Sequence, residues 1–246
     1  KEPPDSLLAL ERRARADTAS AQSLLHSQGY YDGLASVQID KDASPVVVDL
    51  VLSPGKRYSL GRADVYYDPE PDIPQFFRNR QREVGFWGLQ TEPVPPPSFP
   101  TVLPGVAIGK PIAADDLLAA VDALPESLRR QGYPLAAVAD TSYTLDREAR
   151  KLNADILVRP GPPALMGRIE VRGAKEVNAE YVQRLAPWNV GEEPWDSDMV
   201  EDYANKLRGL GLFRSVQVKP QEENLAWGAG RESASVLPLE VTVAES

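Results

Sequence analysis

Apolar and polar residues alternate in three short stretches that lie far apart in the chain. The alternating apolar positions are Val46, Val48, Leu50 and Leu52, then Leu152, Ala154, Ile156 and Val158, and finally Leu237, Leu239, Val241 and Val243. A period of two over this length is typical of a β-strand with one buried face. The pattern therefore predicts three strands of one kind, spread along the sequence.

A helical pattern that ends in glycine and an aromatic or apolar residue precedes each of these strands. Glycine is suited to the end of a helix because it accepts a left-handed backbone conformation. A short strand candidate follows each ending. The endings read LLHSQGYY at 24–31, LRRQGYP at 128–134 and LRGLGLF at 207–213, and the strand candidates are 36–40, 137–143 and 215–220.

Two junctions repeat one another. The stretch PGKRYSLGRADV at 54–65 aligns without a gap with PGPPALMGRIEV at 160–171. Each follows an alternating strand and leads into another strand candidate, so each is interpreted as the joint between one repeated unit and the next. If the connections between packed units are short, the glycines of the joints act as hinges; alternatively, they only permit tight turns. These glycines are Gly55, Gly61, Gly161 and Gly167.

The last unit presents the whole plan of the repeat. A strand from Arg168 to Arg172 is followed by a helix over about 178–185 and by a second helix that Asp196 or Ser197 is placed to cap. Two strands complete the unit. This order predicts an α+β module in which two helices pack on a three-stranded sheet.

Three such modules in tandem account for the chain. The first, 1–57, lacks a candidate for its first strand, and the third is 164–246. The second, 58–163, follows the same plan enlarged by a proline-rich insertion at 68–111, and Pro125 is expected to kink its second helix. The insertion is expected at the surface, with its middle pinned to the module by aromatic residues. These are Phe76, Phe77, Phe86 and Trp87.

Composition and charge argue against several classes of function. The net charge of −9 disfavours binding to a nucleic-acid phosphate backbone, and the absence of cysteine excludes disulfides and thiolate catalysis. The single histidine, His26, has no Ser-His-acid pattern around it, and the acidic residues near Glu192 fit no cation-binding loop. We therefore expect no enzyme, no cofactor and no metal. No apolar run reaches the roughly 20 residues that a membrane-spanning helix needs.

The repeated marks resemble those of POTRA domains. They are the glycine-aromatic ending of the second helix, a strand of the form SVQV, and GRIEVRGA at the start of a unit. Three tandem units, with GLFRSVQVKP and SVLPLEV near the end, look most like the periplasmic region of TamA-like proteins in the BamA/TamA superfamily of outer-membrane assembly proteins.

The resemblance implies a place and a set of partners. It implies the periplasmic side of the outer membrane of a Gram-negative bacterium, with a transmembrane β-barrel in cis after residue 246. It also implies that the arm receives unfolded outer-membrane proteins, autotransporters among them, and meets a TamB-like inner-membrane protein. A POTRA arm of a BamA-type protein or of a two-partner secretion transporter is the alternative, as is a structural tether without client contact.

The strand after each glycine stop is, by the same resemblance, the sheet edge to which an extended client adds. The alternative is that these are plain strand and core residues; Val216 and Val218 are expected to face the helices. Trp227 is expected to face the barrel, whereas Trp188 and Trp195 are expected in the core. The candidate client-binding residues are Val37, Gln38 and Ile39, Ala139, Asp140 and Thr141, and Ser215, Val216, Gln217 and Val218.

Overall fold

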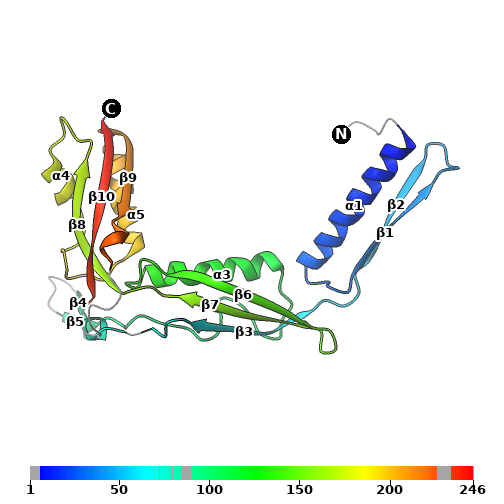
Figure 1. Cartoon of the computed structure of the whole chain (residues 1–246), viewed down its shortest axis with the longest axis horizontal. Helices are drawn as coiled ribbons and strands as arrows, with labels where there is room; N and C mark the ends of the chain where they lie inside the picture. Colours follow the sequence, from blue (N-terminus) through cyan, green and yellow to red (C-terminus); the bar gives the residue numbers. More distant parts are fainter. Residues whose placement is uncertain (1–5, 72, 79, 85–89, 226–233, 246) are drawn as a thin grey trace. The chain divides into compact units, whose positions relative to one another are not determined.

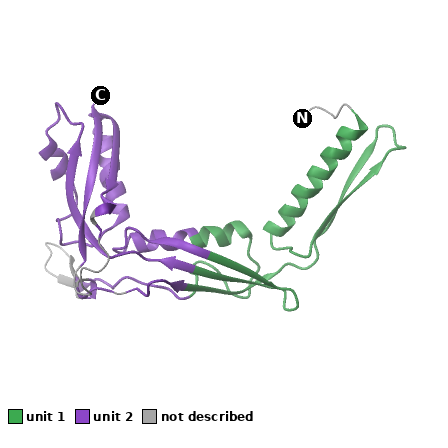
Figure 2. Ribbon diagram, viewed as in Figure 1, with its two compact units in different colours: residues 1–65, 102–121, 141–156 green, residues 66–101, 122–140, 157–246 purple. Residues whose placement is uncertain are grey.

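A computed structural model describes the backbone of residues 6–71, 73–78, 80–84, 90–225 and 234–245 (Figure 1). The chain forms three sheets with helices packed on them, which is the predicted α+β class. It also divides into two compact units, and the division falls within the middle sheet, so each unit holds part of the second module (Figure 2). The units are residues 1–65, 102–121 and 141–156, and residues 66–101, 122–140 and 157–246.

The first module consists of one helix and a hairpin. Helix α1 (Leu7–Ser27) begins at Ser6, whose side chain accepts a hydrogen bond from the backbone N–H of Ala9, and the chain turns at Gly29 with φ of 86°. Strands β1 (Leu34–Asp40) and β2 (Val47–Ser53) pair antiparallel. Within the described residues this sheet has only two strands, which agrees with the missing first strand that the sequence predicts.

The second module has a three-stranded sheet in which the last strand is central. The order is β3-β7-β6, from β3 (Ser59–Tyr67), β7 (Lys151–Arg159) and β6 (Ala137–Asp146). Helix α3 (Ala114–Arg129) contains Pro125 and continues through it, and the kink expected there stays a prediction.

In the described residues of the proline-rich insertion, 68–111, no helix is longer than four residues. Its described part contains a four-residue helix, α2 (Gln75–Arg78), and a hairpin of β4 (Gln81–Val84) with β5 (Gln90–Pro93). Neither is long enough to cover the sheet. The following residues, 94–113, run to the start of α3 without a helix or a named strand.

The insertion also supplies part of the module's core. Phe77 and Leu103 are each only 2% exposed, which confirms that Phe77 pins the segment. The Phe99 ring lies 5.1 Å from that of Tyr133 and 5.4 Å from that of Tyr67. Burial raises the pKa of Tyr67 to about 12, and its hydroxyl donates to the carbonyl of Pro100 at 2.9 Å. Phe86 and Trp87, and the side chain of Phe76, lie outside the described residues.

The third module follows the predicted plan most closely. Two helices, α4 (Ala179–Arg184) and α5 (Ser197–Gly209), accompany a sheet of order β8-β10-β9. Asp196 is the residue that caps α5, and β8 starts four residues earlier than predicted. The remaining elements are β8 (Ala164–Arg172), β9 (Phe213–Pro220), the 3-10 turn η2 (Glu222–Asn224) and β10 (Ser235–Glu245).

Aromatic and aliphatic side chains fill the interior of the third module. Trp188 and Trp195 are buried there, as predicted, and the Trp188 ring lies edge-on to the ring of Tyr203 at 5.4 Å. Val216 and Val218 pack against the same cluster, which confirms that they face the helices. The central strand β10 contributes alternate residues, namely Leu237, Leu239, Val241 and Val243.

The second glycine of the repeated joint has a packing role in β8. Strand β8 pairs parallel with β10, and the register shifts between Leu237 and Leu239. Gly167 lies at this irregularity, where an added Cβ atom would overlap the backbone carbonyl of Leu237. Only glycine fits there, because the obstacle is backbone and cannot rotate away.

We therefore expect Gly167→Ala to lower the free energy of unfolding by about 1–3 kcal/mol, the usual cost of overpacking. Urea denaturation followed by circular dichroism measures it. Gly209→Ala is the matched control, because Gly209 ends α5 with open space around its Cα. Equal stability of the two variants would contradict the proposed close approach.

Candidate functional site: the edges of the sheets

Strand β9 forms one edge of the third sheet and carries four of the predicted client-binding residues. Ser215 and Gln217 are exposed, whereas Val216 and Val218 are half-buried against the core. Among the described residues, no strand pairs with β9 on the side away from β10. This edge therefore presents backbone N–H and C=O groups to an incoming strand.

The opposite edge, β8, is closed by the chain itself. Near its start, the backbone N–H of Met166 donates to the carbonyl of Glu193 at 2.7 Å, and the N–H of Trp195 donates to the carbonyl of Ala164 at 2.9 Å. Further along, side chains occupy the outer carbonyls. The module thus protects one edge and leaves the other open.

The second sheet repeats this asymmetry. Its β6 edge carries the predicted Ala139, Asp140 and Thr141, and no further strand pairs with β6 in the part of the chain that the structure describes. At the β3 edge the insertion pairs with the strand: the N–H of Leu103 donates to the carbonyl of Ala63 at 2.9 Å. Closure here comes from extended backbone instead of side chains.

The first sheet is less covered than the others. Predicted residues Val37, Gln38 and Ile39 lie on β1, and the start of that strand is bonded to Gln22 of α1, which accepts from the N–H of Ala35 at 2.9 Å. Strand β2 corresponds to β7 and β10, whose alternate apolar side chains are buried in the other two modules. On β2 the three matching side chains are 37–49% exposed. They are Val48, Leu50 and Leu52.

Both joints close with the same backbone hydrogen bond. The N–H of Tyr58 donates to the carbonyl of Gly29 at 2.9 Å, and the N–H of Ala164 donates to that of Gly132 at 2.8 Å. In each case the strand of the next module meets the glycine that ends the preceding helix. Asp32 strengthens the first joint by accepting from the Tyr58 hydroxyl at 2.8 Å.

The predicted hinge glycines fall into two groups. Gly55 and Gly161 lie in connections and have φ of 70° and 74°. Gly61 and Gly167 lie inside β3 and β8, where the neighbouring strand leaves little room for a side chain. The role of all four as hinges stays a prediction.

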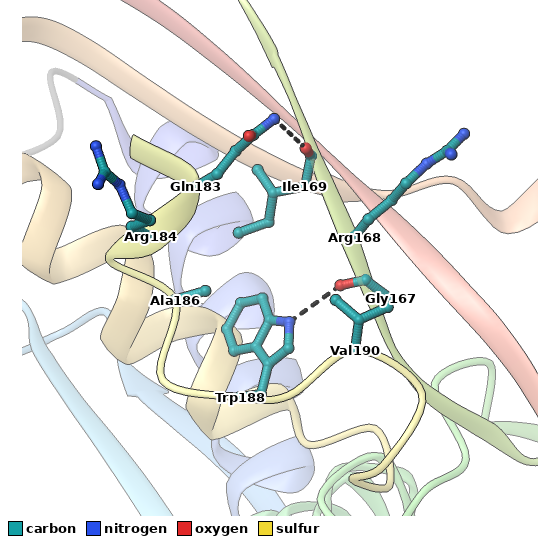
Figure 3. A pocket seen from close by; sticks show the side chains of 8 residues that line it. All are labelled: Gly167, Arg168, Ile169, Gln183, Arg184, Ala186, Trp188 and Val190. Atoms are coloured by element: carbon teal, nitrogen blue, oxygen red, sulfur yellow. Dashed lines mark hydrogen bonds between the residues drawn. The ribbon is translucent and has the colours of Figure 1, made fainter. Parts of the chain in front are cut away.

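A slot of about 450 Å³ lies between β8 and the segment 183–190, which comprises the end of α4 and the residues that follow it (Figure 3). Two hydrogen bonds cross from this segment to the strand. The indole N–H of Trp188 donates to the carbonyl of Gly167 at 3.0 Å, and the Gln183 side-chain amide donates to the carbonyl of Ile169 at 2.9 Å. Ile169, Ala186 and Val190 give the slot an apolar lining.

Sequence reasoning did not identify Glu245, which anchors the end of β10. Its carboxylate accepts hydrogen bonds from the backbone N–H groups of Lys175, Glu176 and Val177 at 2.7–3.2 Å. These bonds favour the ionised form and hold the pKa of Glu245 below the ordinary 4.5. A lone glutamate near the end of a chain carries no sequence signal for such a role.

The other sequence candidates give no sign of chemistry. His26 is exposed and shares a hydrogen bond of 2.8 Å with Gln22. In the described ranges, no three His, Asp or Glu side chains gather as a metal site, and no helix is both long and apolar enough to span a bilayer. Trp227, predicted to face a barrel, lies outside these ranges.

Comparison with known proteins relates the chain to POTRA structures by fold. No family model matches the sequence, and no curated protein does. The chain is similar to POTRA3-5 of BamA from Haemophilus influenzae, with a TM-score of 0.50 and 16% identity over 94% of this chain and 80% of that one. It is also similar to BamA from Haemophilus ducreyi lacking POTRA domains 1-3, with a TM-score of 0.51, 13% identity and 77% of this chain covered. The chain spans 30% of that second protein. At these identities the likeness shows the fold alone: three POTRA-like modules in tandem, of which the first has a two-stranded sheet among the described residues.

We expect Glu245→Gln to reduce stability at neutral pH and to flatten its dependence on acid. Because the folded-state pKa is lowered, the ionised carboxylate stabilises the fold above pH 4.5, and this contribution is lost as the pH falls through the folded value. Urea denaturation across this range measures the difference between the variant and the wild type, which should shrink on acidification. Glu201→Gln, a change on an exposed part of α5, should leave the profile unchanged. A constant difference at every pH would contradict the ionic role of Glu245.

Proposed function

We propose that this chain is the periplasmic arm of an outer-membrane β-barrel assembly or translocation protein, and that its open sheet edges bind unfolded outer-membrane proteins by strand addition. The observation that supports this most directly is the unequal treatment of the two edges. In the third module the chain covers the first strand, β8, whereas among the described residues no strand pairs with the outer side of β9, the strand that follows the glycine stop.

Strand addition suits a client population of varied sequence. The incoming chain is held through main-chain hydrogen bonds, which depend little on its side chains. Each bond contributes only about 0.5–1.5 kcal/mol net. An edge of the length of β9, Phe213–Pro220, therefore gives weak, reversible capture, and a client passes on to the next site without a large barrier.

Three edges along one arm also raise the local concentration of binding sites. A client released from β6 remains close to another edge on the same chain, so rebinding is favoured over escape. The candidate edge residues differ in character: Asp140 and Thr141 on β6 are polar, while Val37 and Ile39 alternate with Gln38 on β1. Different client segments are thus favoured at different modules.

The wider assignment rests on the sequence resemblance to TamA-like proteins together with the fold. In this proposal the arm lies on the periplasmic side of the outer membrane, belongs to a protein with a barrel in cis, and contacts a TamB-like inner-membrane protein. Gly55 and Gly161 serve as the bending points of the arm in this proposal, and Trp227 contacts the barrel. A BamA-type or two-partner secretion arm, or a tether without client contact, is the competing assignment.

The test of client binding is an NMR titration of the ¹⁵N-labelled chain with an unfolded peptide copying one strand of an outer-membrane barrel. We expect saturable shifts of the backbone amides of 215–218, with smaller shifts at 37–39 and 139–141, because β9, β1 and β6 are each the last strand of their sheet among the described residues. If the amides of 215–218 do not move while the peptide remains soluble, strand addition at β9 is excluded.

Photo-crosslinking provides the matched comparison in cells. A photoreactive residue at Gln217, exposed on the open edge, should capture nascent barrel proteins. The same residue at Glu201, which is also exposed but lies on helix α5, should capture far less, because a helix face offers no strand edge. Equal capture at both positions would favour the tether or a non-specific surface over an edge-specific arm.

A further inference from the structure

The slot beside β8 is a place that strand addition at β9 does not use. Its backbone frame consists of the carbonyls of Gly167 and Ile169, and its lining is apolar except for Gln183 and the two arginines at its sides (Figure 3). No carboxylate is among the residues that line it. The slot is therefore an apolar recess in a positively charged rim, on a chain whose net charge is −9.

The second module shows how the equivalent position beside β3 is filled. In the repeat GRADV/GRIEV, Ala63 aligns with Ile169. The carbonyl of Ala63 accepts from the backbone N–H of Leu103 at 2.9 Å, and Val102 bridges Asp64 antiparallel. The side chain of Leu103 is buried. At this position the chain itself supplies an extended segment with an aliphatic residue.

In the third module the matching carbonyl, that of Ile169, accepts a hydrogen bond from a side chain. The amide of Gln183 donates to Ile169, and Gln183 is exposed, so its amide regains water when another donor replaces it. The exchange conserves the number of hydrogen bonds on the strand. The slot then receives the side chain of the new segment, as the second module receives Leu103.

The two arginines beside the slot, Arg168 and Arg184, indicate the charge of a polypeptide segment that would bind there. In the first copy of the Gly-Arg pair, Arg62 is bound to Asp155 at 2.6 Å and to Asp64 at 2.8 Å. In the second copy, Arg168 pairs with Glu170 at 3.1 Å and its side chain remains 73% exposed. Arg184, on the other side of the slot, donates to a carbonyl of its own helix at 3.4 Å. The two cations thus remain available to carboxylates at the two ends of a bound segment.

We propose that this slot binds an extended segment of a partner polypeptide, antiparallel to β8, in which an aliphatic residue lies between two acidic residues. The aliphatic side chain enters the recess between Ala186 and Ile169, its backbone N–H replaces the Gln183 amide, and the carboxylates approach Arg184 and Arg168. This site differs from the open edge at β9 and uses side-chain chemistry for selection, so it serves a specific partner and not the general client population.

The test uses the ¹⁵N-labelled chain and two synthetic peptides, acetyl-Asp-Val-Leu-Asp-Thr-amide and its counterpart with lysine in place of both aspartates. We expect the acidic peptide to shift the Trp188 indole N–H, the Gln183 side-chain amide and the backbone amide of Ile169, with the lysine peptide binding at least about threefold more weakly. Absence of these shifts at about 1 mM peptide would overturn the proposal. So would shifts confined to 215–218, which would place the peptide on the β9 edge.

Variants separate the recess from the charge. Ala186→Leu fills the slot and should weaken binding of the acidic peptide by about tenfold. Arg184→Glu, a surface change that leaves the core intact, should reverse the preference between the two peptides. Arg208→Glu on α5, whose side chain bonds Asn205 at 2.8 Å, is the control and should bind as the wild type does. Unchanged affinity in Arg184→Glu would overturn the assignment of an acidic partner even if Ala186→Leu loses stability.

Discussion

The hydrogen-bonding demand of strand edges governs this structure. A three-stranded sheet has two edges, and each one carries backbone groups that must be bonded by the chain, by water or by a partner. In the third module, Gln183 and Trp188 meet that demand on β8. In the second, the segment around Leu103 meets it on β3. Among the described residues no strand pairs with the outer side of β9, and this is the edge at which the proposed strand addition takes place.

The two ways of closing an edge have different consequences. Backbone closure by the insertion fills the edge of β3 and buries Leu103, which makes the insertion part of the module's core. Side-chain closure on β8 leaves the slot between Ala186 and Ile169 open to a ligand. A module that closes an edge with side chains retains a site that can be occupied reversibly, because a side-chain amide is displaced more easily than a backbone segment that is itself part of the fold. The general client edge and the proposed selective slot therefore lie on opposite sides of the same small sheet.

The backbone bonds at the two joints show how a repeated sequence produces a repeated connection. Gly29 and Gly132 end their helices and then accept from the first strand of the next module. Small modules of this kind have limited cores, and the contacts at the joints add to the stability of each neighbour. Asp32 at the first joint and Glu245 at the end of β10 also hold chain segments together through side-chain hydrogen bonds. No periodic sequence pattern predicts these bonds. The carboxylate of Glu245 fixes the last described strand to the loop that follows β8.

The sequence by itself determined the repeat, the α+β class, the missing strand of the first module and the burial of Trp188, Trp195, Val216 and Val218. These follow from period and spacing, which report local backbone geometry and the side that faces the core. Only the tertiary structure decided that the insertion pairs with β3 and buries Leu103, that Gly167 lies against the carbonyl of Leu237, and that Gln183 and Trp188 bond the outer carbonyls of β8. Each of these depends on which distant segments meet, and a contact between segments remote in sequence leaves no periodic trace in either one.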